Sequence, residues 1–283
     1  MKIKDNRTFS FVVIFLVYLV ATLVGLTVYF AVDTSFYFRF LLADVAATVV
    51  TFLFSIIFKN ASVYDPYWSV LPIVVTSFYA INTPLTITRF LFLIVVLLWG
   101  VRLTANWAYT FKGLNHQDWR YTMLKEKTGL FYPFVNFLGI HLFPTLVVYA
   151  CMLPVVFTFK LNFNLNALSV VFLFLSTCAI ILQGVSDVQM HKYRKNRTTR
   201  FIRSGLWKYS RHPNYLGEIL MWWGVALAFI SAVPSMWYMC VGAVINNLMF
   251  LFISVPLADG RQSKKEGFKE YKSETRMLLP IRK

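Results

Sequence analysis

The sequence predicts an all-α protein, a polytopic membrane helix bundle. The chain has 283 residues, of which 58% are hydrophobic and only 14% charged, and its mean hydropathy is +0.61. Soluble domains typically carry about 25% charged residues, so this composition excludes an ordinary soluble domain. The long apolar runs do not alternate with a period of two, which excludes a transmembrane β-barrel.

Charge-poor runs long enough to cross about 30 Å of hydrocarbon predict eight transmembrane helices. They lie near residues 10–31, 40–58, 67–81, 86–109, 134–158, 167–190, 213–231 and 236–256. The third and seventh runs are short, so we expect tilted or re-entrant helices there. No small-x-small cleavage pattern follows the first run, and we interpret it as a retained span rather than a signal peptide.

The basic residues predict the orientation of the bundle. The formal net charge is +16, and 24 of the 28 Lys and Arg residues fall on one predicted side of the membrane. The others are Arg39, Arg89 and Lys160 on the opposite side and Arg102 inside the fourth span. By the positive-inside rule, both termini are cytoplasmic.

No repeat or flexible linker divides the chain, which predicts a single membrane domain over residues 1–283. It consists of N-terminal spans (1–63) and a main region (64–280), with basic cytoplasmic loops at 110–133 and 191–212 and a basic tail at 258–283. In the tail, Phe268, Tyr271 and Leu278 punctuate a Lys- and Glu-rich segment. This pattern predicts a short helix that lies on the headgroups or caps the bundle.

The sequence lacks the common soluble signatures. Its three cysteines have no CxxC spacing, and there is no GxGxxG, GxxxxGK[ST], HExxH or GxSxG motif. A Rossmann-bound cofactor, a zinc hydrolase and a metal site are therefore not expected. Because topology and anionic headgroups account for the basic charge first, we expect membrane lipid rather than nucleic acid as a partner. The oligomeric state is not indicated.

Two polar stripes mark the cytoplasmic ends of predicted spans. The stripe in the fourth span consists of Arg102, Asn106 and Tyr109. The stripe where the sixth span emerges consists of Gln183, Asp187, His191 and Arg194. Their helical spacing places each set on one face. A snorkelling arginine and an internal salt bridge are the structural alternatives to a functional site.

The segment from Gly205 to Glu218 is the densest polar cluster. Pro213 suits the first turn of a helix, and Asn214 and Glu218 then share one face of it. Free backbone N–H groups flanked by Lys208, Arg211 and His212 predict an anion site at this helix start.

Two further segments are candidates by position. Residues 115–121 are interpreted as an amphipathic cytoplasmic loop beside these clusters, and residues 64–68 open the third span with an acid and three aromatics. The second segment fits either a membrane-interface belt or a substrate-facing group. Asp44, Asn246 and Asn247 are interpreted as interhelical hydrogen-bonding groups.

Taken together, these pieces resemble the steroid 5-alpha-reductase-like family, in particular its prokaryotic branch of membrane proteins, over about residues 64–280. The matching segments are residues 99–104, Asp118-Trp119-Arg120-Tyr121, Ser186-Asp187 with Arg194, residues 205–218, and Gly267-Phe268-x-x-Tyr271 leading to Leu279-Pro280. The resemblance implies a multi-pass protein of the bacterial inner membrane. It also implies NADPH as cofactor, and hydride transfer to an activated carbon–carbon double bond of a lipid-soluble isoprenoid, fatty or sterol-like enone.

The resemblance also implies site residues. The residues implied to contact NADPH are Asn214, Asp187, Arg194, Arg102, Tyr209, Arg200, Arg211, His212, Asp118, Arg120 and Tyr121. Glu218 faces the cofactor pocket and is a catalytic candidate. Where the steroid reductases have a Gln-Glu-Leu-Pro segment and a carbonyl-polarising tyrosine, this chain has Tyr64-Asp65-Pro66-Tyr67 and Trp99. An indole does not usefully release a proton, so Asp65 and Tyr64 are the candidates for the acid.

Two alternatives stay open. Isoprenylcysteine-type methyltransferases, which use S-adenosylmethionine, share an Arg-His-Pro-x-Tyr-x-Gly turn with a Glu below it. Asp118 to Tyr121 and the pair Asp187 and Arg194 favour the reductase. A non-enzymatic lipid-binding or transport protein explains the hydrophobicity, but not the cations gathered at one helix mouth.

Overall fold

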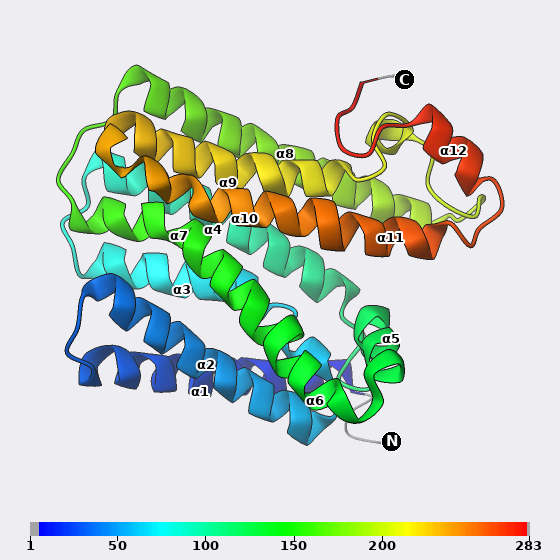
Figure 1. Ribbon diagram of the computed structural model, residues 1–283, viewed down its shortest axis with the longest axis horizontal. Helices are drawn as coiled ribbons and strands as arrows, with labels where there is room; N and C mark the ends of the chain where they lie inside the picture. The colour runs from blue at the N-terminus through cyan, green and yellow to red at the C-terminus, as the bar shows by residue number, and fades with distance from the viewer. Residues whose placement is uncertain (1–5, 282–283) are drawn as a thin grey trace.

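The computed structural model describes residues 6–281 and confirms an all-α bundle (Figure 1). Its α-helices are α1 (Arg7–Ala31), α2 (Phe36–Phe58), α3 (Tyr67–Ile81), α4 (Ile87–Thr110), α5 (Trp119–Thr128), α6 (Tyr132–Val135), α7 (Phe143–Lys160), α8 (Ala167–Lys195), α9 (Pro213–Ala232), α10 (Val241–Met249), α11 (Val255–Gln262) and α12 (Phe268–Glu274). Short 3₁₀ or π segments are η2 (Ala61–Tyr64), η3 (Gly129–Phe131), η4 (Asn136–Leu142), η5 (Gly205–Lys208), η6 (Pro234–Cys240) and η7 (Phe250–Ser254). Lys2, Lys4, Arg282 and Lys283, which entered the charge pattern, lie outside the described residues.

Seven stretches within residues 6–281 are long and apolar enough to cross a membrane. They are Arg7–Ala31, Phe36–Phe58, Ile87–Thr110, Trp119–Lys160, Ala167–Lys195, Pro213–Ala232 and Pro234–Gln262. The structure differs from the predicted eight at α3, which has 15 residues and is therefore only about 22 Å long. Pro66 precedes this helix, and Asn82 caps its end. Despite its length, α3 runs alongside the neighbouring helices. The start of α1 lies at the same end of the bundle as α12 (Figure 1).

Helix starts are fixed by local capping. Asn6, Thr86 and Asn166 accept hydrogen bonds from backbone N–H groups three residues later, at the starts of α1, α4 and α8. Asp118 caps α5 in the same manner, with its side chain accepting from the N–H of Arg120. The segment 110–133, predicted as a loop, therefore contains a helix of 10 residues.

The core lies where α8 and α9 pack against α4 and α7. Trp99, Phe92, Met152 and Trp222 are at most 2% exposed. Gly217 of α9 lets the two long helices approach closely. A Cβ at this position would lie 2.7 Å from the backbone oxygen of Ala179 in α8. This approach brings the polar faces of α8 and α9 together.

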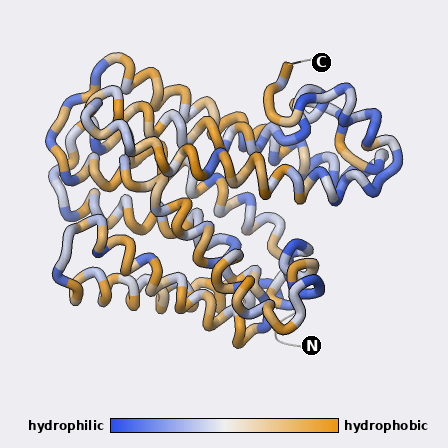
Figure 2. The backbone as a smooth tube through the Cα atoms, in the orientation of Figure 1, coloured by the Kyte–Doolittle hydropathy of each residue, from blue (hydrophilic) through white to orange (hydrophobic). Residues whose placement is uncertain are grey.

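The two ends of the bundle differ in polarity. Figure 2 shows hydrophilic residues gathered at the end that carries α5, α11 and α12. There Phe268 and Tyr271 of α12 pack on Phe201 of the basic loop, with ring centroids 5.3 and 5.2 Å away. The predicted tail helix is thus confirmed, and it covers the loop 191–212.

At the opposite end, Arg89 joins α4 to α7. Its buried guanidinium donates to the backbone oxygen of Pro84 at 2.7 Å and to Oδ1 of Asn162 at 3.0 Å. It also reaches the carbonyl oxygens of Thr158 and Leu161. Arg89 was predicted on the less basic side of the membrane. Its buried charge is stabilised by these hydrogen bonds, most of which go to backbone carbonyl oxygens.

Candidate functional site

Arg102 of α4 lies at the centre of the polar site. Its Nη1 donates to Asp187 Oδ2 at 2.8 Å, and its Nη2 donates to Gln183 Oε1; both partners lie on α8. Its Nη2 also lies 3.7 Å from Glu218 Oε2 of α9. The predicted stripes on α4 and α8 therefore face each other, and Arg102 links three helices.

Glu218 is held by two tryptophans. Trp99 Nε1 lies 3.0 and 2.9 Å from the two carboxylate oxygens, and Trp222 Nε1 donates to Oε1 at 3.0 Å. The two indole rings meet edge to face with centroids 4.9 Å apart. A buried carboxylate is tolerated only with such compensation, so Trp99, Trp222 and Arg102 together account for an acid inside the bundle.

The stripes continue toward the hydrophilic end. His191 Nε2 lies 2.7 Å from Asn106 Oδ1, and its ring lies 4.5 Å from that of Tyr109. The contacts between α4 and α8 therefore extend through successive helical turns. Arg194, one turn beyond His191, is exposed at the mouth of this seam.

Several polar atoms in this region have no partner. Among the described residues, Asn214 Oδ1, Gln183 Nε2 and Arg102 Nε are buried atoms without a hydrogen bond. Buried polar groups are normally paired, so each marks a place where a ligand or water would gain a hydrogen bond. All three belong to the candidate site.

Arg211 and His212, which were predicted to contact the cofactor, are directed toward Asp259 of α11 and toward the C-terminal tail. His212 Nε2 lies 2.9 Å from Asp259 Oδ1, and Arg211 contacts Asp259 Oδ2 at 3.3 Å. Arg211 Nη1 also donates to the backbone oxygen of Thr275 at 2.6 Å. These two side chains therefore fasten the start of α9 to α11 and to the tail.

The remaining predicted cations are exposed in the loop between α8 and α9. Arg200 forms an exposed ion pair with Glu266 at 2.7 Å, while Lys208 lies over the ring of the exposed Tyr209. Exposed pairs of this kind contribute little to stability. These side chains stay accessible to an anion.

A separate acidic and aromatic group lies between η2 and α5. Tyr121 donates to Asp65 Oδ1 at 2.6 Å, and Arg120 pairs with Asp118 at 2.8 Å. Burial raises the pKa of Asp65 to about 6, although the Arg120 charge and the Tyr121 hydroxyl oppose the rise. The pKa of Asp118 is lowered, because contacts with Arg120 outweigh the effect of burial.

Tyr64 is buried on another side of the bundle. Its hydroxyl lies 2.8 Å from Thr145 Oγ1 of α7, and its ring lies 4.7 Å from that of His141. Tyr64 and Asp65 are neighbours in sequence, yet their contacts are with α7, η4 and α5 rather than with the helices that hold Glu218. The structure thus joins Arg102, Asp187 and Glu218 in one region, with Asn214 one helical turn before Glu218 on α9. Asp65 and Tyr121 form a second region.

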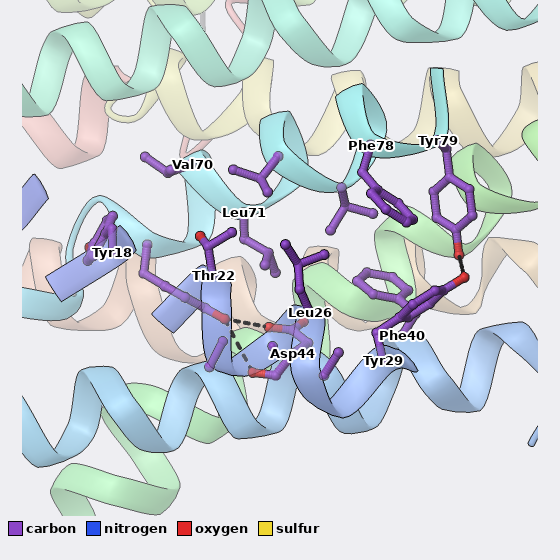
Figure 3. A pocket seen from close by; sticks show the side chains of 16 residues that line it. Tyr18, Thr22, Leu26, Tyr29, Phe40, Asp44, Val70, Leu71, Phe78 and Tyr79 are labelled. Carbon is purple, nitrogen blue, oxygen red and sulfur yellow. Dashed lines mark hydrogen bonds between the residues drawn. The ribbon is translucent and has the colours of Figure 1, made fainter. Parts of the chain in front are cut away.

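An apolar pocket opens between α1, α2 and α3 (Figure 3). Among its lining residues, Tyr67 donates to Asp44 Oδ1 at 2.9 Å, and the hydroxyl oxygens of Tyr29 and Tyr79 lie 3.1 Å apart. This confirms Asp44 as an interhelical hydrogen-bonding group. Next to Tyr67 on α3, the ring of Trp68 lies 6.3 Å from that of Trp99, so α3 contacts both the pocket and the Glu218 region.

Sequence reasoning missed two partners. Trp222 gave no sign of its role, although its position one turn after Glu218 on the same face is a usable signal. Asp259 lies directly after the last apolar run and is an isolated acid beside basic segments. That charge pattern would have marked it as a partner for the cations at the start of α9.

The fold and this site define a polytopic, all-helical membrane protein with a cation-rich polar site at one end. The chain belongs to the family described as "Protein of unknown function (DUF1295)", which matches residues 51–275. It is also similar to the uncharacterised protein C594.04c of Schizosaccharomyces pombe, with 26% identity over 194 residues, or 58% of this chain. That match covers 56% of the yeast protein. No solved structure matches the chain.

Proposed function

We propose that the protein is an integral-membrane, NADPH-dependent reductase that acts on a carbon–carbon double bond in a lipid-soluble enone. The observation that carries the proposal is the polar region around Arg102, where carboxylates, unpaired amide atoms and cations meet at one helix mouth. Polar groups at membrane depth are costly and mark functional sites. The motif resemblance supports the choice of chemistry.

The residues present fit a polyanionic dinucleotide. Arg194, Arg200 and Lys208 are exposed at the mouth and supply positive potential. Deeper, Asn214 Oδ1 and Gln183 Nε2 are buried and unpaired, which suits the amide of a nicotinamide ring. Asp187 and Glu218 hold Arg102, so its guanidinium is positioned before any ligand arrives.

Reduction of the double bond requires one hydride and one proton. When bound, NADPH supplies the hydride and leaves as NADP⁺. Asp65 is our candidate for the proton source, because its pKa of about 6 keeps part of it protonated near neutral pH. Glu218 accepts hydrogen bonds from two indoles, and we assign it to positioning Trp99 and Arg102.

The apolar pocket between α1, α2 and α3 offers room for the hydrocarbon body of a substrate. Such a substrate would enter from the bilayer, while the cofactor enters from the hydrophilic end. We place the protein in the bacterial inner membrane, with that end facing the cytoplasm.

The test is calorimetric titration of detergent-purified protein with NADPH, NADH and S-adenosylmethionine. We expect NADPH to bind, and Asn214→Ala and Asp187→Ala to weaken binding by at least about tenfold, the equivalent of one lost hydrogen bond to a charged group. Asn247→Ala and Asp33→Ala are matched controls that lie outside the site and should bind as the wild type does.

The alternatives give different outcomes. If S-adenosylmethionine binds and NADPH does not, the result would support an isoprenylcysteine-type methyltransferase in place of a reductase. Binding of neither nucleotide would leave a lipid-binding or transport protein and overturn the proposal. Equal loss in the control variants would show that the effect is not specific to the site.

A further inference from the structure

A second cavity, distinct from the pocket between α1, α2 and α3, lies at the end of α2 that Lys59 follows. It is a cavity of about 190 Å³ lined by the end of α2, the loop before α5, α5 itself and the segment from α6 into η4. None of its residues belongs to the reductase site proposed above. The cavity is therefore separate from that site.

Two cations border this cavity. Lys59 follows α2, and Lys125 lies in the last turn of α5. Within residues 6–281, no carboxylate lies within ion-pair distance of either ammonium group. Their positive charges are thus available to an anion that bridges them.

Two unpaired polar groups line the same cavity. Asn136 is 5% exposed; its Nδ2 donates to Ser55 Oγ at 3.2 Å, while its Oδ1 has no partner. The hydroxyl of Tyr132 is likewise buried and unpaired. A buried side chain with an unused acceptor beside an unused hydroxyl needs a ligand or water to complete it.

Two carbonyl groups at the end of α2 are already hydrogen-bonded. The N–H of Lys59 donates to the oxygen of Ile56 at 3.0 Å, and the N–H of Asn60 donates to that of Ser55 at 2.9 Å. Lys59 itself adopts a left-handed backbone conformation with φ of 54°, which ends the helix at this residue.

The neighbouring surface is apolar. Leu130, Phe131 and Phe134 are 96%, 72% and 67% exposed, and they directly flank Tyr132. Three exposed hydrophobic side chains next to a cation-bordered cavity are typical of insertion at the boundary between headgroups and acyl chains. A free anion would gain no favourable contact with these apolar side chains.

We propose that this cavity binds the headgroup of an anionic phospholipid. The phosphate lies between Lys59 and Lys125 and accepts a hydrogen bond from the hydroxyl of Tyr132, while a headgroup hydroxyl donates to Asn136 Oδ1. The acyl chains extend past Phe131 and Phe134. Phosphatidylglycerol has both the phosphate and the hydroxyl groups that this arrangement requires.

The experiment is native mass spectrometry of the full-length protein with added phosphatidylglycerol or phosphatidylcholine. We expect the wild type to retain phosphatidylglycerol preferentially, and Lys59→Asn with Lys125→Gln to reduce that retention severalfold. Asn tolerates the left-handed conformation at position 59. The control, Lys264→Gln with Lys269→Gln, removes the same charge from exposed tail positions and should retain the lipid.

Each other outcome overturns the proposal. Equal retention by the double variant shows that the cavity is not the site, and equal loss in the tail control shows attraction by net charge alone. Displacement of the lipid by inorganic phosphate, with the same dependence on Lys59 and Lys125, identifies a free-anion site instead. Lys125→Gln alone, on the exposed face of α5, provides the same test if the double variant does not fold.

Discussion

Trp99 of α4 donates its indole N–H to both carboxylate oxygens of Glu218 in α9, at 2.9 and 3.0 Å, and both side chains are buried. The two residues are far apart in sequence and come from helices that each carry part of the polar site. This hydrogen bond therefore joins two halves of the bundle at the depth where charge is most costly.

We expect Trp99→Phe to destabilise the protein by about 1.5–3 kcal/mol, because a buried carboxylate loses a hydrogen-bond donor. The measurement is the free energy of unfolding by SDS in mixed micelles. Trp237→Phe is the matched control, since Trp237 is 69% exposed and its substitution should change stability little. An equal loss in both variants would contradict a specific role for the indole at position 99.

Gly217→Ala should weaken the packing of α8 on α9. The added Cβ would lie 2.5 Å from Gln183 Cγ and 2.7 Å from the backbone oxygen of Ala179, and overpacking of this kind costs about 1–3 kcal/mol. Gly260→Ala, in α11, has no atom within 4 Å of the new Cβ and should be neutral or slightly stabilising. The thermal unfolding midpoints of the two variants distinguish these outcomes.

Asp259→Asn should loosen the tail, because Asp259 joins Arg211 and His212 at the start of α9. Without its charge the fastening of α12 weakens, and we expect trypsin to cleave the basic tail several times faster than in the wild type. Glu266→Gln, which removes an exposed partner of Arg200, is the control. Unchanged tail cleavage in Asp259→Asn would show that aromatic packing on Phe201 is sufficient.

Asp65 should make stability dependent on pH. Burial raises its pKa in the folded protein to about 6, whereas in the unfolded chain it is about 4. The folded state therefore holds the proton more tightly, and this stabilisation is complete below pH about 4 and lost as pH rises through about 6. Relative to Asp65→Asn, the wild type should lose stability across this window and then level off.

Tyr121→Phe provides a second test of the same group. The Tyr121 hydroxyl stabilises the carboxylate of Asp65, so its removal should raise the pKa further and extend the loss of stability to higher pH. Unfolding midpoints measured from acid to neutral pH give both profiles. Asp33→Asn, at the opposite end of the bundle, should reproduce the wild-type profile.

The helices and the polar faces follow from local sequence, whereas their partners do not. The spacing of Asp187 and His191 on α8 was enough to predict one face, and Pro213 was enough to predict the start of α9. By contrast, the choice of Asp259 as partner for His212 depends on packing between elements 47 positions apart. The cavity at Lys59 and Asn136 likewise forms only when α2, α5 and η4 meet.

Length and capping explain the differences in the elements themselves. α3 is shorter than a bilayer because turn residues bound it closely, and α5 forms within a predicted loop because Asp118 caps its start. The short apolar run at 67–81 already indicated the length of α3, whereas α5 is not visible in hydropathy, which measures apolar content over a window longer than this helix.

The guanidinium of Arg89 joins two helices at the end of the bundle opposite the hydrophilic end. Its hydrogen bonds to carbonyl oxygens of the loop before α4 and of the end of α7 join the two helices at the far end of the bundle. These contacts close the space between the two helices around a buried charge at that end. If the proposed cofactor site is correct, a water-soluble ligand reaches the Arg102 region from the hydrophilic end of the bundle, where α5, α11 and α12 lie.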